Sequence, residues 1–116
     1  MAVLSLYRGD DHAYVLTFTN GSSVAIDITG YTVFFTVKTN KSDTDANAII
    51  SKTVTTHTTP TSGITTISLD NSDTDITVGD YYYDIQLKDT SSKITTVMSD
   101  KFIVLQDITL RESWAI

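Results

Sequence analysis

The stretch Gly79-Asp80-Tyr81-Tyr82-Tyr83-Asp84-Ile85-Gln86-Leu87 carries the strongest structural pattern in the chain. Its large apolar side chains fall at every second position, which are Tyr81, Tyr83, Ile85 and Leu87. The positions between them, from Tyr82 to Lys88, are mostly polar. A period of two residues is typical of a strand with one buried face, whereas a helix would scatter these residues around its circumference. The stretch therefore predicts a half-buried strand of an antiparallel sheet.

The same alternation, read outward in both directions, predicts about seven strands separated by turn residues. Besides the tyrosine strand, they run from Val3 to Tyr7, His12 to Thr19, Tyr31 to Lys38, Ala48 to Thr56, Ile64 to Leu69 and Ile94 to Leu105. A short further strand is expected from Val24 to Ile28, and a kink near Ser99-Asp100 in the last strand. Since every segment is β, two stacked sheets are the economical arrangement, with a small barrel as the alternative.

The connections carry their own signals. Asn20-Gly21 predicts a tight hairpin turn, because both residue types accept positive φ angles. The polar run 40–47 predicts a loop, and Asp70 to Asp75 predicts one helical turn with Ile76 packed inward. Lys52 shares a strand face with two apolar residues, which is typical of an edge strand protected by a charge.

Composition limits the possible functions. The chain has 116 residues, no cysteine, and a net charge of -6 with its eight basic residues scattered singly. Zinc ribbons and thiol chemistry are excluded, and nucleic acid is not an expected partner because no basic cluster is present to neutralise phosphates. No apolar stretch resembles a signal peptide or approaches the ~18 residues of a membrane span. We expect a soluble, single-domain protein that is made in the cytoplasm.

Catalytic and metal-binding patterns are missing from the sequence. It has only two histidines, His12 and His57, and no serine lies in a Gly-x-Ser-x-Gly element, so no serine nucleophile is indicated. The run from Asp43 to Asn47 imitates the start of a calcium loop, but Ala48 and Val54 stand where glycine and a bidentate acid are required. We expect no enzyme activity, no catalytic or metal-binding residue, and no cofactor.

Three aromatic residues are candidate contact residues for a partner, namely Phe34, Tyr82 and Trp114. Alternation places Phe34 among threonines on the outer face of its strand, and Tyr82 on the outer face of the tyrosine strand. Trp114, the only tryptophan, belongs to the apolar tail 108–116, which follows the domain expected over residues 1–107. That tail either folds back over an open end of the domain or anchors a partner subunit.

A family resemblance rests on five segments in order. They are Tyr7 to Asp11, Ile28 to Lys38, Ile50 to Val54, Gly79 to Leu87 and Lys101 to Leu105. In order and spacing these segments resemble the N-terminal domain of phage baseplate upper proteins, which are tail components of long-tailed phages of Gram-positive bacteria. The match covers roughly residues 5–107 and consists of framework residues. Gly79 and Tyr81 also resemble the tyrosine corner of immunoglobulin-like sandwiches.

The resemblance implies an immunoglobulin-like antiparallel β-sandwich without enzyme activity. Such a module attaches fibre or receptor-binding components to a phage or prophage tail baseplate through protein-protein contacts. Its implied partners are other tail proteins, with a homo-oligomer in the virion as one arrangement, and neither nucleic acid nor membrane. Tyr83 and Phe35 are expected to fill the space that cysteines and tryptophan occupy in antibody domains.

The competing interpretation is a carbohydrate-binding module that contacts bacterial cell-wall glycans. Sugars stack on aromatic rings beside polar groups, and four tyrosines are candidates if they gather on one exposed face: Tyr7, Tyr14, Tyr31 and Tyr82.

Overall fold

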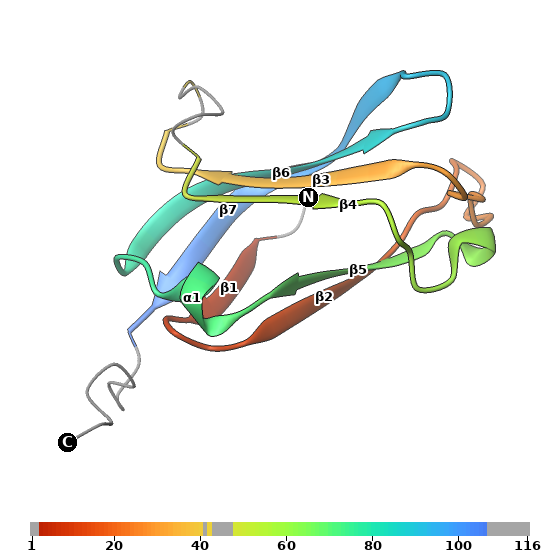
Figure 1. The fold of residues 1–116 in the computed structure, drawn as a ribbon. Coiled ribbons are helices and arrows are strands. Elements are labelled where there is room, and N and C mark those ends of the chain that lie inside the picture. The colour runs from red at the N-terminus through yellow and green to blue at the C-terminus, as the bar shows by residue number, and fades with distance from the viewer. Residues whose placement is uncertain (1–2, 41, 43–47, 107–116) are drawn as a thin grey trace.

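The computed structural model describes residues 3–40, 42 and 48–106. Within them the regular structure is almost all β, with seven strands in two layers (Figure 1). The strands are β1 (Leu4–Tyr7), β2 (His12–Thr17), β3 (Thr32–Lys38), β4 (Ile50–Val54), β5 (Ile64–Leu69), β6 (Gly79–Lys88) and β7 (Ile94–Leu105). These seven strands confirm the number of strands predicted from the alternation in the sequence, and most of their predicted positions.

One layer is a curled five-stranded sheet in the order β1-β7-β6-β3-β4, and the other is the antiparallel two-stranded sheet β2-β5. All neighbours are antiparallel except β1, which runs parallel to β7 with Leu4 opposite Phe102 and Tyr7 opposite Leu105. The larger sheet is therefore mixed, and the expectation of a purely antiparallel arrangement was wrong at this edge. Alternation within a strand gives its face but not the direction of its neighbour.

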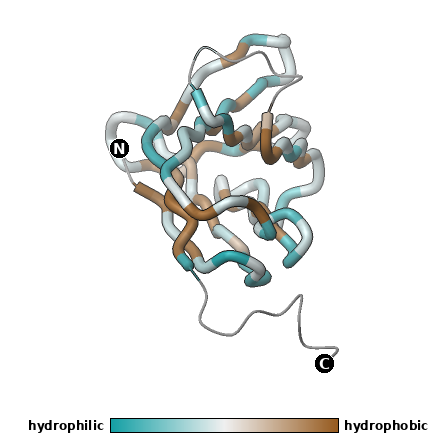
Figure 2. Tube along the Cα trace, turned by 90° about the vertical axis from the view of Figure 1, so that its left-hand side faces the viewer, coloured by the Kyte–Doolittle hydropathy of each residue, from teal (hydrophilic) through white to brown (hydrophobic). Residues whose placement is uncertain are grey.

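The core lies between the two layers and is built from the apolar face of each strand. Tyr81, Tyr83, Ile85 and Leu87 of β6 are all buried, and Val33, Phe35 and Val37 of β3 are fully buried beside them. Ile67 and Leu69 of β5 close the core from the smaller sheet. Along the strands, hydrophobic and hydrophilic residues alternate as this arrangement requires (Figure 2).

Aromatic rings occupy the centre of this core. Phe35 has its ring centroid 5.9 Å from Tyr83, 6.0 Å from Phe102 and 6.2 Å from Tyr14. Phe35 and Tyr83 are both buried in this core, since 0% and 2% of their surfaces are exposed.

The short helix α1 (Asn71–Thr74) connects the two layers at one end of the molecule (Figure 1). Asp70 is its N-cap, and it accepts from the backbone amides of Ser72 and Asp73 while the Asp73 side chain accepts from the amide of Asp70. This reciprocal capping box satisfies amides that a single helical turn leaves without partners. Ile76 then packs against the core, as the sequence predicted.

Three local predictions were wrong in detail. In the turn after β2 the residue with positive φ is Ser23, at 62°, because the Asn20 side chain accepts from the amides of Ser22 and Val24 and sets a longer loop. The segment from Val24 to Ile28 makes only an isolated bridge between Ala25 and Thr19. The irregularity in β7 falls at Val97, where Ile85 pairs with Met98 and Gln86 with Thr96, rather than near Ser99.

Candidate functional site

The outer face of the five-stranded sheet, turned away from β2 and β5, carries two of the predicted contact residues. On β3 the side chains of Val33, Phe35 and Val37 point into the core, so Phe34 and its alternate neighbours point outward. On β6 the same alternation turns Tyr82 outward between buried Tyr81 and Tyr83. No strand that the structure describes covers this face.

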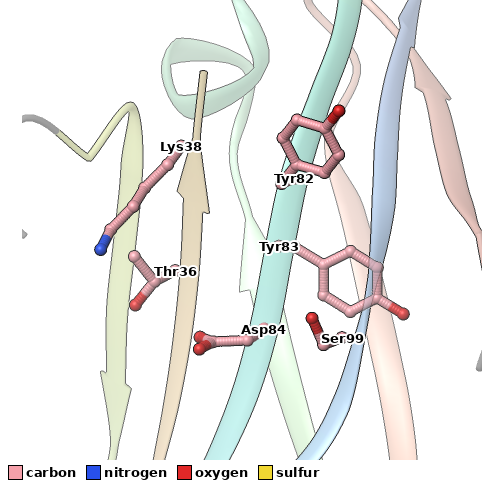
Figure 3. Close-up of a pocket in the computed structure, with 6 residues that line it drawn as sticks. All are labelled: Thr36, Lys38, Tyr82, Tyr83, Asp84 and Ser99. Atoms are coloured by element: carbon pink, nitrogen blue, oxygen red, sulfur yellow. The ribbon is translucent and has the colours of Figure 1, made fainter. Parts of the chain in front are cut away.

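Strand register brings polar residues from three strands into rows around Tyr82. Tyr82 on β6 lies opposite Lys38 on β3 and Lys101 on β7. The next outward row consists of Thr36, Asp84 and Ser99. These two rows border a shallow depression of about 170 Å³ lined by Thr36, Lys38, Tyr82, Tyr83, Asp84 and Ser99 (Figure 3).

The lining of the depression is mostly polar and includes one acidic and one basic side chain, those of Asp84 and Lys38. The Asp84 carboxylate extends from β6 toward the Thr36 side chain on β3 (Figure 3). Gln86 lies one row further along β6. Its Nε2 donates to Asp84 Oδ2 and to Thr96 Oγ1, each at a distance of 3.4 Å. The contact with Gln86 restrains the acidic side chain on the outer face of the sheet.

Tyr83 borders the depression but belongs to the core. Its side chain is 2% exposed, and burial, with a smaller effect from the negative charge of Asp100, raises the pKa of its hydroxyl. The phenol is therefore neutral at physiological pH and contributes a wall rather than a reactive group.

The predicted contact residues do not form one cluster. Phe34 and Tyr82 are both half-buried on the same outer face, but Phe34 lies opposite Gln86, four residues from Tyr82 on β6. That separation is about 13 Å along the strand. Trp114 lies outside the described residues. Tyr82 has the depression beside it, whereas Phe34 does not line it.

The four tyrosines considered for sugar binding do not gather on one face. Tyr14 and Tyr31 are half-buried and pack against the core. Tyr7, at 53% exposure, lies on the edge strand β1, and only Tyr82 borders the depression.

His57 has a structural role that the sequence did not reveal. Its Nδ1 lies 2.9 Å from the hydroxyl of fully buried Thr65, and its Nε2 lies 2.6 Å from the carbonyl oxygen of Tyr31. Since a carbonyl only accepts, Nε2 donates to Tyr31. The histidine therefore connects β5 to the chain entering β3 from the loop that follows β4.

Other kinds of site find little support among the described residues. They contain no group of three or more histidine, cysteine, aspartate or glutamate side chains that could hold a metal ion. No helix in the described part of the chain is long and apolar enough to cross a bilayer.

Sequence reasoning named Tyr82 as a candidate contact residue but not the residues around it. Asp84 was recognisable as its outward neighbour, because the two are separated by one position on the same strand. Lys38, Thr36 and Ser99 were not recognisable, because they come from other strands and only the register brings them to Tyr82.

We compared the sequence of this chain with those of known proteins and found no relative. No protein-family model matches the chain, and no curated protein sequence matches it.

Proposed function

We propose that this protein is an immunoglobulin-like β-sandwich that serves as a non-enzymatic adaptor in a phage or prophage tail baseplate. In this role it attaches fibre or receptor-binding components through protein-protein contacts. The basis is the resemblance of its framework segments to the N-terminal domain of phage baseplate upper proteins, together with the surface around Tyr82.

Two features support the immunoglobulin-like part of the proposal. The five-stranded sheet faces the β2-β5 pair. Within the five-stranded sheet, β1 runs parallel to β7, the last strand in the chain. At the start of β6 the Tyr81 hydroxyl donates to the carbonyl oxygen of Thr77, four residues upstream. This hydrogen bond resembles the tyrosine corner of such sandwiches, in which a tyrosine bonds back to nearby backbone.

The observation that carries the proposed function is the depression beside Tyr82. A half-buried aromatic residue lies there among polar groups, with Lys38 and Lys101 opposite it and Asp84 in the floor. Protein interfaces commonly combine an aromatic anchor with a polar rim. Since all these residues stand on paired strands rather than on loops, the surface meets its partner in a fixed geometry.

Rigid presentation is the mechanism that follows. A paired sheet holds the contact residues in place, so little conformational entropy is lost on binding. Copies arranged around a tail axis would engage several partners at once, and linked contacts raise the overall affinity well above that of one contact.

The test is binding to the products of the reading frames that neighbour this gene. We expect co-expression and size-exclusion chromatography to yield a complex with at least one tail protein. Tyr82→Ala should weaken that complex about tenfold or more, as an anchor residue does. Val15→Ala, on the exposed face of the other sheet, is the control. Absence of any complex, or equal affinity for Tyr82→Ala and wild type with matching melting temperatures, would contradict the proposal.

A carbohydrate-binding module is the second candidate, and the composition of the same depression favours it. An aromatic ring beside a carboxylate and hydroxyls, as Tyr82 lies beside Asp84 and Thr36, is the kind of surface on which a sugar stacks. Binding of cell-wall polysaccharide on a glycan array, lost in Tyr82→Ala, would support this candidate. A flat response for the wild type would remove it.

A further inference from the structure

Strand β1 forms one edge of the five-stranded sheet, with β7 on one side and no strand of the described chain on the other (Figure 1). The amide of Arg8, directly after β1, donates to the carbonyl oxygen of Leu105 in β7 at a distance of 2.9 Å. Successive residues of a strand point their N–H and C=O groups to opposite sides, so the even-numbered residues here point these groups toward β7. The odd-numbered residues present theirs to the open side: Val3, Ser5 and Tyr7.

This edge lacks the features that keep strands of other molecules away from a sheet. From Val3 to Tyr7 the sequence contains no charged residue and no proline, whereas β4, at the opposite edge, carries Lys52. Val3 and Tyr7 are each 53% exposed, and Leu105, which lies opposite Tyr7, is 38% exposed. An open edge with exposed apolar side chains and no protecting charge is suited to pairing with a further strand.

The sequence of this edge is complementary to a second copy of itself. When two copies pair antiparallel with Ser5 opposite Ser5, Val3 of each copy lies opposite Tyr7 of the other, and Leu4 lies opposite Leu6. The first pair brings two exposed apolar side chains together on the outer face. The second pair extends the inner face, where Leu6 is buried and Leu4 is half-buried. Both faces of the sheet therefore continue across the pair.

The backbone groups match in the same register. Val3, Ser5 and Tyr7 point their amides and carbonyls to the open side, so each of the three residue pairs can exchange two hydrogen bonds. The Tyr7 carbonyl also accepts from the Asp10 amide at 3.2 Å, and its second lone pair serves the other copy. A shift by one residue would set these groups against residues whose own groups point toward β7. The direction of the backbone groups thus excludes the neighbouring registers.

We infer that two copies of this protein pair through β1, antiparallel about a two-fold axis at Ser5, so that their five-stranded sheets join into one continuous sheet. A two-fold pair uses the same edge of both copies and closes on itself. Because β1 has only four residues, we expect a weak dimer with a dissociation constant in roughly the micromolar range. The pairing is independent of the proposed role in a phage tail, since none of these residues lines the depression beside Tyr82.

Hydrogen exchange of the wild-type protein at two concentrations locates the pairing. We expect the amides of Ser5 and Tyr7 to exchange several-fold more slowly at about 1 mM than at about 10 µM, because dimerisation covers them. The Arg8 amide, which already bonds to β7, is the internal reference and should not change. Rapid exchange of Ser5 and Tyr7 at both concentrations would overturn the inference. Equal protection at both would also overturn it, because the edge would then be covered within one molecule.

A matched pair of lysine variants tests the contact by sedimentation. Ser5→Lys places two like charges opposite each other at the two-fold axis, and we expect it to weaken the dimer about fivefold or more. Ser51→Lys adds the same charge at an exposed position of the opposite edge strand β4 and should sediment as the wild type does. A monomeric wild type at about 1 mM, or equal dimer affinities for both variants, would contradict pairing through β1.

Disulfide cross-linking tests the register. The chain has no cysteine, so a single introduced cysteine can bridge only to a second copy. Residues opposite each other in a hydrogen-bonded pair have Cα atoms about 5.5 Å apart, which is within the range of a disulfide. We expect Ser5→Cys to form a covalent dimer under mild oxidation, whereas Ser51→Cys, the control, stays monomeric. Failure of Ser5→Cys to cross-link, or equal cross-linking of both variants, would overturn the two-fold axis at Ser5.

Discussion

Gly63 is the residue whose replacement the backbone tolerates least. It follows the 3₁₀ turn Pro60–Ser62 with φ of 71°, in the left-handed region that favours glycine. A Cβ atom at this position would lie 2.6 Å from the Phe18 carbonyl oxygen and 2.7 Å from that of Ile26. Both neighbours are backbone atoms, so neither can rotate away.

Gly63→Ala is therefore expected to lower the free energy of unfolding by about 2 kcal/mol or more, from the strained φ together with the clash. The matched control is Gly21→Ala, because Gly21 has no positive φ and a Cβ atom added to it would meet nothing within 4 Å. We expect that control to change stability by no more than about 1 kcal/mol in either direction. Urea denaturation of both variants measures the difference, and equal stabilities would contradict the close approach at Gly63.

Tyr14 places a hydroxyl against the core without giving it a partner. Among the described residues no hydrogen-bonding group reaches its buried oxygen. Burial, with a smaller effect from Tyr83, raises the pKa of Tyr14 to about 12. Because the hydroxyl is dehydrated without compensation, Tyr14→Phe is expected to leave the stability at neutral pH unchanged or to increase it. A clear loss of stability in thermal melting would reveal a partner for this hydroxyl.

The same tyrosine predicts how stability responds to alkali. The folded protein holds the Tyr14 proton more tightly than the unfolded chain, whose tyrosines titrate near pH 10. Between about pH 10 and 12 the folded state therefore binds more protons, and the free energy of unfolding falls as pH rises. Tyr14→Phe should make this decline shallower in urea unfolding at a series of pH values. An identical decline in wild type and variant would argue against a buried hydroxyl.

At the scale of elements, the edge strand β4 is protected by one charge. Lys52 shares the inward face with Ile50 and Val54, and its Nζ lies 2.8 Å from Asp73 Oδ2 in α1. Both side chains are partly exposed, at 32% and 22%, so this ion pair contributes little to stability. The main effect of Lys52 is to place an inward-facing charge on an edge strand, which discourages a strand of another molecule from pairing with it.

Lys52→Ile is expected to change the free energy of unfolding by less than about 1 kcal/mol while increasing aggregation. Lys93→Ile, in the exposed turn between β6 and β7, removes the same charge away from the edge and serves as control. Light scattering at constant temperature measures the difference. If both variants aggregate at the same rate, net charge rather than edge protection is the cause.

The elements that the sequence predicted well are those with one buried face. β5 was predicted to the residue, and β6 differs from its prediction by one residue, since buried and exposed side chains alternate in both. The segment from Val24 to Ile28 alternates equally well but is no strand. Its backbone turns to other partners, with Ile26 donating to Phe18 and Ile28 to Pro60. Alternation reports burial, and burial does not require a strand.

At the scale of the whole molecule, the sequence predicted an all-β protein but not how its strands meet. Parallel pairing of β1 with β7 joins residues about a hundred positions apart, and the Val97 irregularity sets which β7 residues face β6. The surface around Tyr82 depends on this register, because Lys38 and Ser99 reach it only through neighbouring strands. The register between strands that are distant in the chain depends on how the side chains of both strands pack on each face of the sheet. The alternation within one strand does not contain that information.

The proposed function depends most on the outer face of β3, β6 and β7 around Tyr82, which we propose attaches this domain to a tail. Electron cryomicroscopy of tail particles from the phage or prophage that carries the gene tests it directly. We expect the domain at the tail tip, repeated around the axis, with Tyr82 and the row of Thr36, Asp84 and Ser99 against a neighbouring subunit. A particle without this domain, or one in which that face is turned to solvent, would contradict the proposed function.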